Sequence, residues 1–306
     1  MEELHWTDEQ KQMAQTAVME RFAFNSVAKQ FVPEVTVDWT ETTVRWNRYD
    51  FKRRMVIDRE TLELYEPYAS VNLSRAQGDE ASLQRALTTL HRAASALARW
   101  HDVLVFSGFD ESINPKPPGI EMPISSVPAP VSLREAALQA EKEEGSGAIP
   151  VDERFANESL VSAAYTAVLK LEERGYYRDY HLALGQTLWT ELNNPNEGAL
   201  VLPRDRIEST LVGGGFYRTT TIPSGEALLI SLDGPTLDCV SAGEPSKQPY
   251  LEFLRTQADD RNEEIYLMRC RERFAPRVRE NRAIVRLKLT DQGRKGNSTG
   301  RGKNDK

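Results

Sequence analysis

The sequence of 306 residues contains only two cysteines and four histidines. Cys239 and Cys270 are too few for a disulfide framework or a zinc ribbon, so we expect them to be small buried or half-buried thiols. The histidines form no HExxH motif and no pair four residues apart, and a zinc site therefore has no support. We predict no metal and no cofactor.

Long apolar runs are also absent. No stretch of about eighteen apolar residues is uninterrupted, and the acidic start MEELHWTDEQ lacks the basic and apolar regions of a secretory signal. The sequence therefore favours a cytoplasmic protein with no membrane partner. The net charge of −7 argues against a general nucleic-acid binder. A hydrophobic content of 40% is enough to bury a sizeable core.

Catalytic motifs are the third absence. Gly213 to Gly215 could cradle a phosphate, but no Gly-Lys-Ser/Thr follows, so a backbone turn is the better interpretation. His101-Asp102 matches the pair of metal phosphohydrolases only as a dipeptide. We predict no catalytic residues and no enzyme activity. An enzyme or a nucleic-acid-binding protein is the alternative, and it rests only on the triple glycine and on a basic segment described below.

Apolar periodicity is strongest between Asp79 and Phe106. Apolar residues recur there at spacings of three and four, which predicts a long amphipathic helix with one buried face. That face carries Leu83, Leu87, Leu90, Ala94, Leu97 and Leu104, and the outward positions are Gln84, Arg85, Arg92 and Arg99. The alternative is a coiled-coil partner helix. Nearer the N-terminus, Thr7 and Gln10 form a capping-box signature, which predicts a helix from there to about Phe24.

Residues 34–73 alternate with period two, which predicts strands, and the first two could form a long arm that reaches away from the body. Basic side chains including Arg53 are concentrated on the returning limb, with Trp46 and Tyr49 interleaved. Such an arm could contact phosphates or lie across an acidic neighbouring subunit. The negative net charge favours the neighbouring subunit.

The second half of the chain divides into four segments. Residues 110–156 hold seven of the sixteen prolines and are predicted to be a surface excursion, interrupted by a short helix at Leu133 to Glu144. A compact α/β portion begins at Asn157. Residues 264–274 and 282–289 are predicted closing strands. The final residues 291–306 are polar, glycine-rich and net positive, which is typical of a disordered tail.

The order and the residues of several stretches resemble those of the encapsulins. These are bacterial nanocompartment shell proteins with the tailed-phage major-capsid fold of the Hong Kong 97 type. The stretches are LHWTDEQ, ELYEPYASVNLSR, ALARWHDVLVFSG, SAAYTAVLKLEERGYYRDYHLALGQTLW, ISLDGPTLDCV and ENRAIVRLKL. The resemblance implies an α+β fold. Its expected parts are an N-terminal helix (1–34), an extended strand arm (35–73), a peripheral domain with the spine helix (74–109 and 250–290), a proline-rich excursion (110–156), an axial domain (157–249) and a basic tail (291–306).

The resemblance also implies a function. We expect the chain to assemble with itself into an icosahedral shell of sixty subunits or a multiple, enclosing a cargo enzyme that carries a short targeting peptide. A bacteriophage or prophage major capsid protein is the alternative. Such a protein commonly begins with a long scaffolding or cleaved segment, for which the residues before Thr7 leave no room.

Three sets of site residues follow from the resemblance. Cargo would dock beside the first helix and the last strand, at Val18, Phe22, Val285 and Leu287, although each of these could simply be core. The axial tip would line a pore with Asn193, Asn194, Pro195, Asn196 and Glu197. The assembly arm would place Trp46, Tyr49 and Arg53 against a neighbouring subunit. A ring of Glu197 carboxylates would favour cations over anions.

Overall fold

The computed structural model describes residues 4–109, 116, 118–122, 130–195, 201–243, 248–258 and 264–290. The chain forms two compact units. The first comprises Met1–Ala136 and Gly234–Asn281, and the second comprises Ala137–Asp233 and Arg282–Lys306. Within the described ranges, no helix has the length and apolar character needed to cross a membrane.

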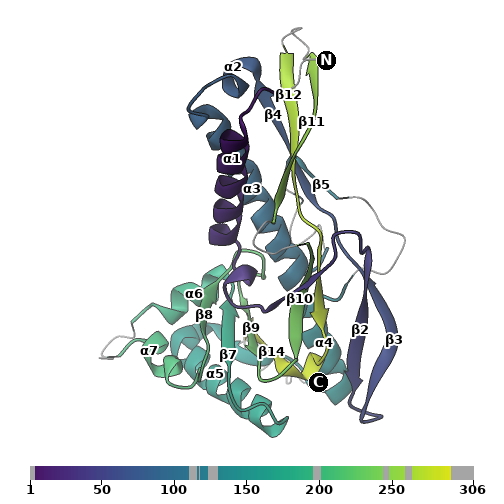
Figure 1. The fold of residues 1–306 in the computed structure, drawn as a ribbon. Helices are drawn as coiled ribbons and strands as arrows, with labels where there is room; N and C mark the ends of the chain where they lie inside the picture. The colour runs from purple at the N-terminus through teal and green to yellow at the C-terminus, as the bar shows by residue number, and fades with distance from the viewer. Residues whose placement is uncertain are drawn as a thin grey trace, which may run out of the picture. The chain divides into compact units, whose positions relative to one another are not determined.

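Two helices lie side by side along the first unit (Figure 1). Helix α1 (Asp8–Asn25) begins at the predicted capping box, in which Thr7 Oγ1 accepts from the Gln10 amide and the Gln10 side chain accepts from the Thr7 amide. This satisfies two groups at the helix end that would otherwise be unpaired. The face of α1 that packs on α3 (Gln84–Phe106) buries Ala14, Val18 and Phe22.

Helix α3 buries Leu90, Ala94, Leu97 and Leu104 of the predicted stripe and half-buries Leu87, but it begins five residues later than expected. Leu83 has φ of +55° and is fully buried, so the backbone turns there before the helix starts. A carboxylate oxygen of Glu80 accepts from the Arg85 amide and satisfies one group in the first turn. A separate short helix, α2 (Arg75–Gly78), precedes this turn.

Three sheets complete the first unit. A four-stranded sheet has the order β11-β12-β4-β5, a three-stranded sheet the order β1-β10-β13, and the arm is the two-stranded pair β2-β3. Their bounds are β1 Glu34–Val37, β2 Thr43–Asp50, β3 Met55–Glu63, β4 Tyr68–Ser74, β5 Ile120–Glu121, β10 Leu237–Ala242, β11 Tyr250–Ala258, β12 Glu264–Arg271 and β13 Phe274–Val278. The predicted arm (35–73) is therefore longer than the hairpin, because β1 pairs with β10 and β4 pairs with β12.

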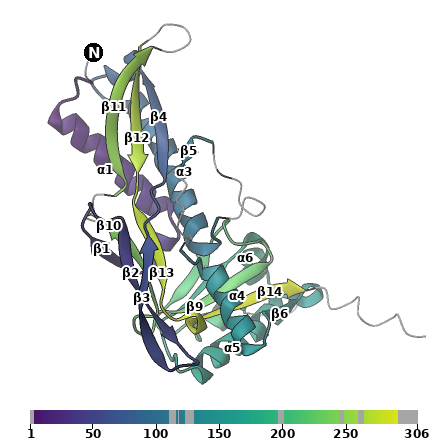
Figure 2. The ribbon, with the colours of Figure 1, turned by 90° about the vertical axis from the view of Figure 1, so that its right-hand side faces the viewer.

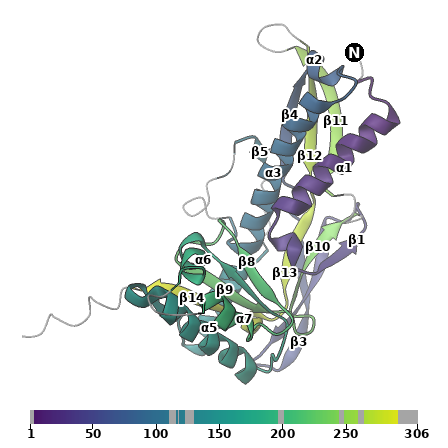
Figure 3. The same ribbon diagram turned by 90° about the vertical axis from the view of Figure 1, so that its left-hand side faces the viewer.

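The second unit is a five-stranded sheet with helices packed on it (Figure 3). The strand order is β6-β14-β9-β7-β8. The elements are α4 Leu133–Glu144, which begins in the first unit, β6 Ile149–Asp152, α5 Ala156–Glu173, β7 Tyr180–Leu184, α6 Gln186–Leu192, α7 Pro203–Glu208, β8 Gly215–Arg218, β9 Glu226–Ser231 and β14 Ile284–Thr290. The core gathers apolar side chains of α5, β7, β9 and β14.

The compact units divide the chain differently from the expected domain boundaries. Strand β14 pairs with β9 and β6 and so lies in the second unit, whereas the sequence analysis grouped 250–290 together. Strand β10 lies in the first unit, although it falls inside 157–249. Residues 149–152 form a strand inside the expected excursion. The predicted tail, 291–306, lies outside the described residues.

Candidate assembly and docking surfaces

The segment before α1 is fixed to the first unit by a buried tryptophan. Trp6 is 6% exposed, and its indole N–H donates to the carbonyl oxygen of Gly78 at 2.8 Å. A Cβ atom at Gly78 would lie 2.4 Å from the Tyr266 ring, so the close approach requires glycine. These contacts hold Leu4 and Trp6 beside the four-stranded sheet.

Gln15 joins α1 to strand β11. Its side-chain nitrogen donates to the carbonyl oxygen of Pro249 at 2.8 Å, and its side-chain oxygen accepts from the amide of Leu251 at 2.9 Å. One side chain thus satisfies two main-chain groups at the start of β11. This fixes the spacing between the helix and the strand over the first half of α1.

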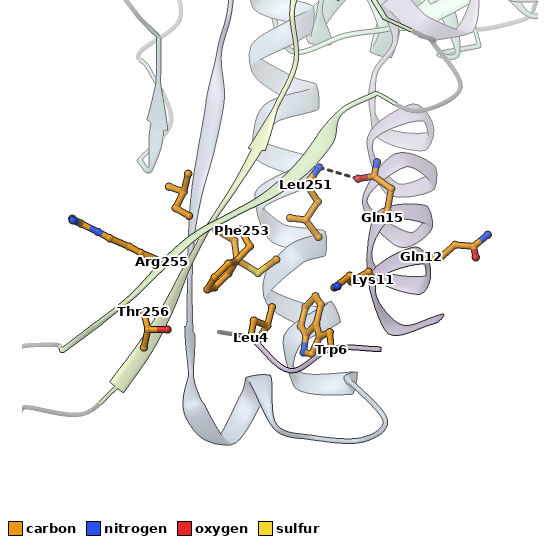
Figure 4. A pocket seen from close by; sticks show the side chains of 11 residues that line it. Leu4, Trp6, Lys11, Gln12, Gln15, Leu251, Phe253, Arg255 and Thr256 are labelled. Carbon is orange, nitrogen blue, oxygen red and sulfur yellow. Dashed lines mark hydrogen bonds between the residues drawn. The ribbon is translucent and has the colours of Figure 1, made fainter. Parts of the chain in front are cut away.

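A cavity of about 720 Å³ lies between α1, the segment before it and β11 (Figure 4). Its lining residues are Leu4, Trp6, Lys11, Gln12, Gln15, Leu251, Phe253, Leu254, Arg255, Thr256 and Met268. Six of these side chains are apolar, two are cations, and none is a carboxylate. Apolar walls with a few polar groups at the margin are typical of a binding site for an apolar ligand.

The four predicted docking residues do not face this cavity. Val18 and Phe22 are 0% and 1% exposed on the face of α1 that packs on α3. Val285 and Leu287 are 4% and 0% exposed and belong to the core of the second unit. The structure therefore favours the stated alternative that all four are core residues, because a buried side chain offers no surface to a ligand.

The arm hairpin β2-β3 lies against β13 of its own unit (Figure 2). The Trp46 indole N–H donates to the carbonyl oxygen of Val278 at 2.7 Å, and the Tyr49 amide donates to that of Arg279 at 2.9 Å. Both side chains are half-buried, whereas Arg53 is exposed. The base of the hairpin therefore already has cover within the chain, contrary to the expectation of an arm that reaches away.

The tip of the same hairpin carries uncovered apolar side chains. Met55 is 53% exposed and Val56 is 48% exposed, at the start of β3. They follow a turn in which Asp50 accepts from the amides of Lys52 and Arg53, and this acceptance lowers the pKa of Asp50. Because successive side chains of a strand point to opposite faces, each face of the hairpin tip carries one exposed apolar side chain.

The predicted pore turn begins directly after α6. Asn193 donates from its side chain to the carbonyl oxygen of Trp189 at 2.8 Å and so closes the last turn of the helix. Asn194 and Pro195 are exposed. Asn196 and Glu197 lie outside the described residues. Pore lining by this turn stays a prediction.

A cluster of buried charges occupies the centre of the first unit. Glu272 is fully buried; it contacts His101 Nδ1 at 3.0 Å and Lys29 Nζ at 3.5 Å. Lys29 is also bonded to Glu34. Burial alone would raise the pKa of Glu272, but His101 and Lys29 hold it below its usual value. The cluster therefore stabilises the unit only while both signs of charge are present.

Both cysteines are buried, as the sequence predicted. Both are buried free thiols, and burial raises the pKa of Cys270 to about 12 and that of Cys239 well above its usual value. Among the described residues, no group of three or more histidine, cysteine or acidic side chains could hold a metal ion.

The fold is of the phage major-capsid type in the α+β class. A virus-like particle from Pyrococcus furiosus matches with a TM-score of 0.62 and 13% identity, over 90% of this chain and 98% of that chain. Mycobacterium phage Adephagia matches with a TM-score of 0.57 and 15% identity, over 87% and 90%. The SrpI encapsulin complex of Synechococcus elongatus matches with a TM-score of 0.51 and 12% identity, over 85% of each chain.

A family model agrees with these structures. Residues 141–246 match the Linocin_M18 family, whose description is "encapsulating protein for peroxidase". Among curated proteins, no sequence matches the chain significantly. The resemblance to the encapsulins is thereby confirmed, since the matches include an encapsulating protein family, a virus-like particle and an encapsulin complex.

Proposed function

We propose that this chain is the shell protein of an encapsulin nanocompartment in the bacterial cytoplasm, which assembles with itself and encloses a cargo enzyme. The family match over residues 141–246 is the observation that carries the proposal, because that family is described by encapsulation of an enzyme. The proposal involves no membrane and no nucleic-acid partner. The alternative, a phage or prophage major capsid protein, is supported by the likeness to phage structures.

The cavity between α1 and β11 is the docking site that we propose for the cargo targeting peptide. It offers apolar contact through Leu251, Phe253 and Met268, and a peptide that fills it would cover apolar surface that is otherwise wet. Lys11 and Arg255 suit a peptide with an acidic residue at one end. This site replaces the four buried residues predicted from the sequence.

Leu254→Asp should reduce cargo content at least tenfold without loss of shells. Leu254 lines the cavity and is 39% exposed, so the charge costs little in the free chain but desolvates when an apolar peptide binds. The measurement is the ratio of cargo to shell protein in purified particles. Met13→Asp is the matched control, since Met13 is 51% exposed on α1 but does not line the cavity. Equal cargo in both variants would contradict docking in this cavity.

The pore proposal predicts a change of charge selectivity. If copies of the turn after α6 converge on a symmetry axis, Glu197→Lys should turn a ring of carboxylates into a ring of cations, which favours anions over cations. The measurement compares uptake of a cationic and an anionic substrate by shells that hold a reporter enzyme. Glu191→Lys, on α6 ahead of the turn, controls for a change of net charge. Unchanged selectivity in Glu197→Lys would exclude this turn as the passage.

A further inference from the structure

Strand β11 forms one edge of the four-stranded sheet, whose order is β11-β12-β4-β5. In the described part of the chain, no strand pairs with the outer side of β11. An edge strand presents unpaired amide and carbonyl groups and can accept an additional strand from another chain. The cavity between α1 and β11 opens on this same strand.

The hydrogen bonds made by Gln15 show which main-chain groups of β11 point away from the sheet. Gln15 contacts the carbonyl of Pro249 and the amide of Leu251, so these two groups face away from β12. In an antiparallel pair, successive residues alternate between the two sides of the strand. The carbonyl of Leu251 and the amide and carbonyl of Phe253 therefore also face outward, whereas Tyr250 and Glu252 bond with β12.

The series of outward-facing main-chain groups on β11 ends at a β-bulge. The register between β11 and β12 shifts between Phe253 and Arg255, which makes Leu254 the bulged residue. A bulge interrupts the alternation and limits how far a strand can be extended along an edge. The regular outward edge therefore covers Leu251 to Phe253, and its upstream limit is the pair of groups that Gln15 already contacts.

We propose that the cargo peptide binds as a short added strand on this edge of β11, with Gln15 marking the end of the pairing. This inference rests on the proposed function of the cavity and specifies how the peptide is recognised. Alternate residues of the peptide enter the cavity beside Leu251, Phe253 and Trp6, and the intervening residues face solvent. The partner is an extended apolar segment with a neighbouring carboxylate, because Lys11 and Arg255 supply positive charge and the lining residues include no acid.

Strand addition sets a particular recognition pattern. Main-chain hydrogen bonds supply affinity that does not depend on sequence, and the cavity selects every second side chain. A peptide bound as a helix would instead be selected at spacings of three and four. The two binding modes differ in the spacing of the peptide residues that matter. Substitutions along the peptide backbone therefore distinguish strand addition from helix binding.

The test uses full-length shell protein without cargo and a dye-labelled twelve-residue peptide that was enriched from a random library on the dissociated protein. The shells are reassembled in the presence of this peptide. Phe253→Pro removes the outward amide without breaking a bond to β12, and Phe253→Leu is the matched control that keeps the amide. Binding is measured by fluorescence anisotropy, and assembly by size-exclusion chromatography. We expect at least tenfold weaker binding for Phe253→Pro and less than threefold for Phe253→Leu.

A second measurement keeps the inference testable if Phe253→Pro does not assemble. N-methylation of the peptide, one residue at a time, should weaken binding to wild-type shells at two positions, two residues apart, whose amides donate to the carbonyls of Leu251 and Phe253. Equal effects at all positions, a period of three to four, or unchanged binding to assembled Phe253→Pro shells would overturn strand addition while leaving the cavity as the docking site. Leu254→Asp should abolish binding of the library peptide. If it does not, the cavity is not the docking site, and the cargo-docking part of the proposed function is wrong.

Discussion

Two aspartates at the tip of the arm should abolish shell assembly and leave folded single subunits. Met55 and Val56 are about half exposed, so Met55→Asp/Val56→Asp removes little buried surface from the chain itself. In a shell these side chains would be covered by a neighbouring subunit, and two charges there would be desolvated without partners. Size-exclusion chromatography and circular dichroism of the purified variant measure assembly and folding separately.

The control places the same charges at the base of the same hairpin. Thr43→Asp/Thr61→Asp adds two carboxylates at exposed positions on β2 and β3, and these strands keep their pairing. This variant should assemble as the wild type does. Intact particles from the Met55/Val56 variant, or equal loss in both, would contradict a specific role of the tip. Deletion of Thr36 to Arg54 is a less selective test, because it also removes part of β1.

Glu272→Ala should destabilise the first unit by about 3–5 kcal/mol, the range for breaking one partner out of a buried ion pair. The substitution removes the carboxylate that both Lys29 and His101 contact, and it leaves a cavity in its place. Unfolding in urea, followed by circular dichroism, measures the free energy. Glu34→Ala is the matched control, because it removes the other carboxylate that contacts Lys29. The Glu34 side chain is 23% exposed, so its loss should cost less. A change of less than about 1 kcal/mol in Glu272→Ala would contradict a stabilising cluster.

The lowered pKa of the Glu272 carboxylate predicts that the folded chain loses stability in acid. Its pKa is lowered in the folded chain from the ordinary value of 4.5, so its contribution is fully present above that value. The contribution is lost as the pH falls through the lower folded pKa. The wild type should therefore lose more stability than Glu272→Gln between about pH 5 and about pH 3.

The sequence predicted the elements whose signals are local. The capping box at Thr7 begins α1, and the apolar stripe of α3 is buried where the periodicity placed it. Helix α4 has the predicted bounds. In each case the pattern lies within a single element, so no distant residue is needed to recognise it.

Strand β6 was missed because its evidence is not local. It contains Pro150, and proline is tolerated there because β6 lies at the edge of its sheet. Its partner is β14, with Ile149 opposite Leu287. A short strand with a proline among other prolines is indistinguishable from a loop until its partner is known.

The docking residues show the limit of periodicity most clearly. The spacing of Val18 and Phe22 correctly indicates one buried face of α1, but it does not reveal that α3 covers that face. The cavity, by contrast, is built from residues near the N-terminus and from β11 and β12, which are more than 230 residues apart. The alternation of Leu251 and Phe253 was a signal for one wall, but its companion wall could not be assigned from the sequence.

Electron cryo-microscopy of particles purified from the native host after nuclease treatment tests the central claim most directly. The account predicts closed icosahedral shells of sixty subunits or a multiple, with protein density attached to the inner wall beside α1 and β11. Nuclease-resistant nucleic acid filling the particles would favour the phage capsid alternative. A protein that elutes as a single 34.6 kDa chain and forms no particles would contradict the shell function altogether.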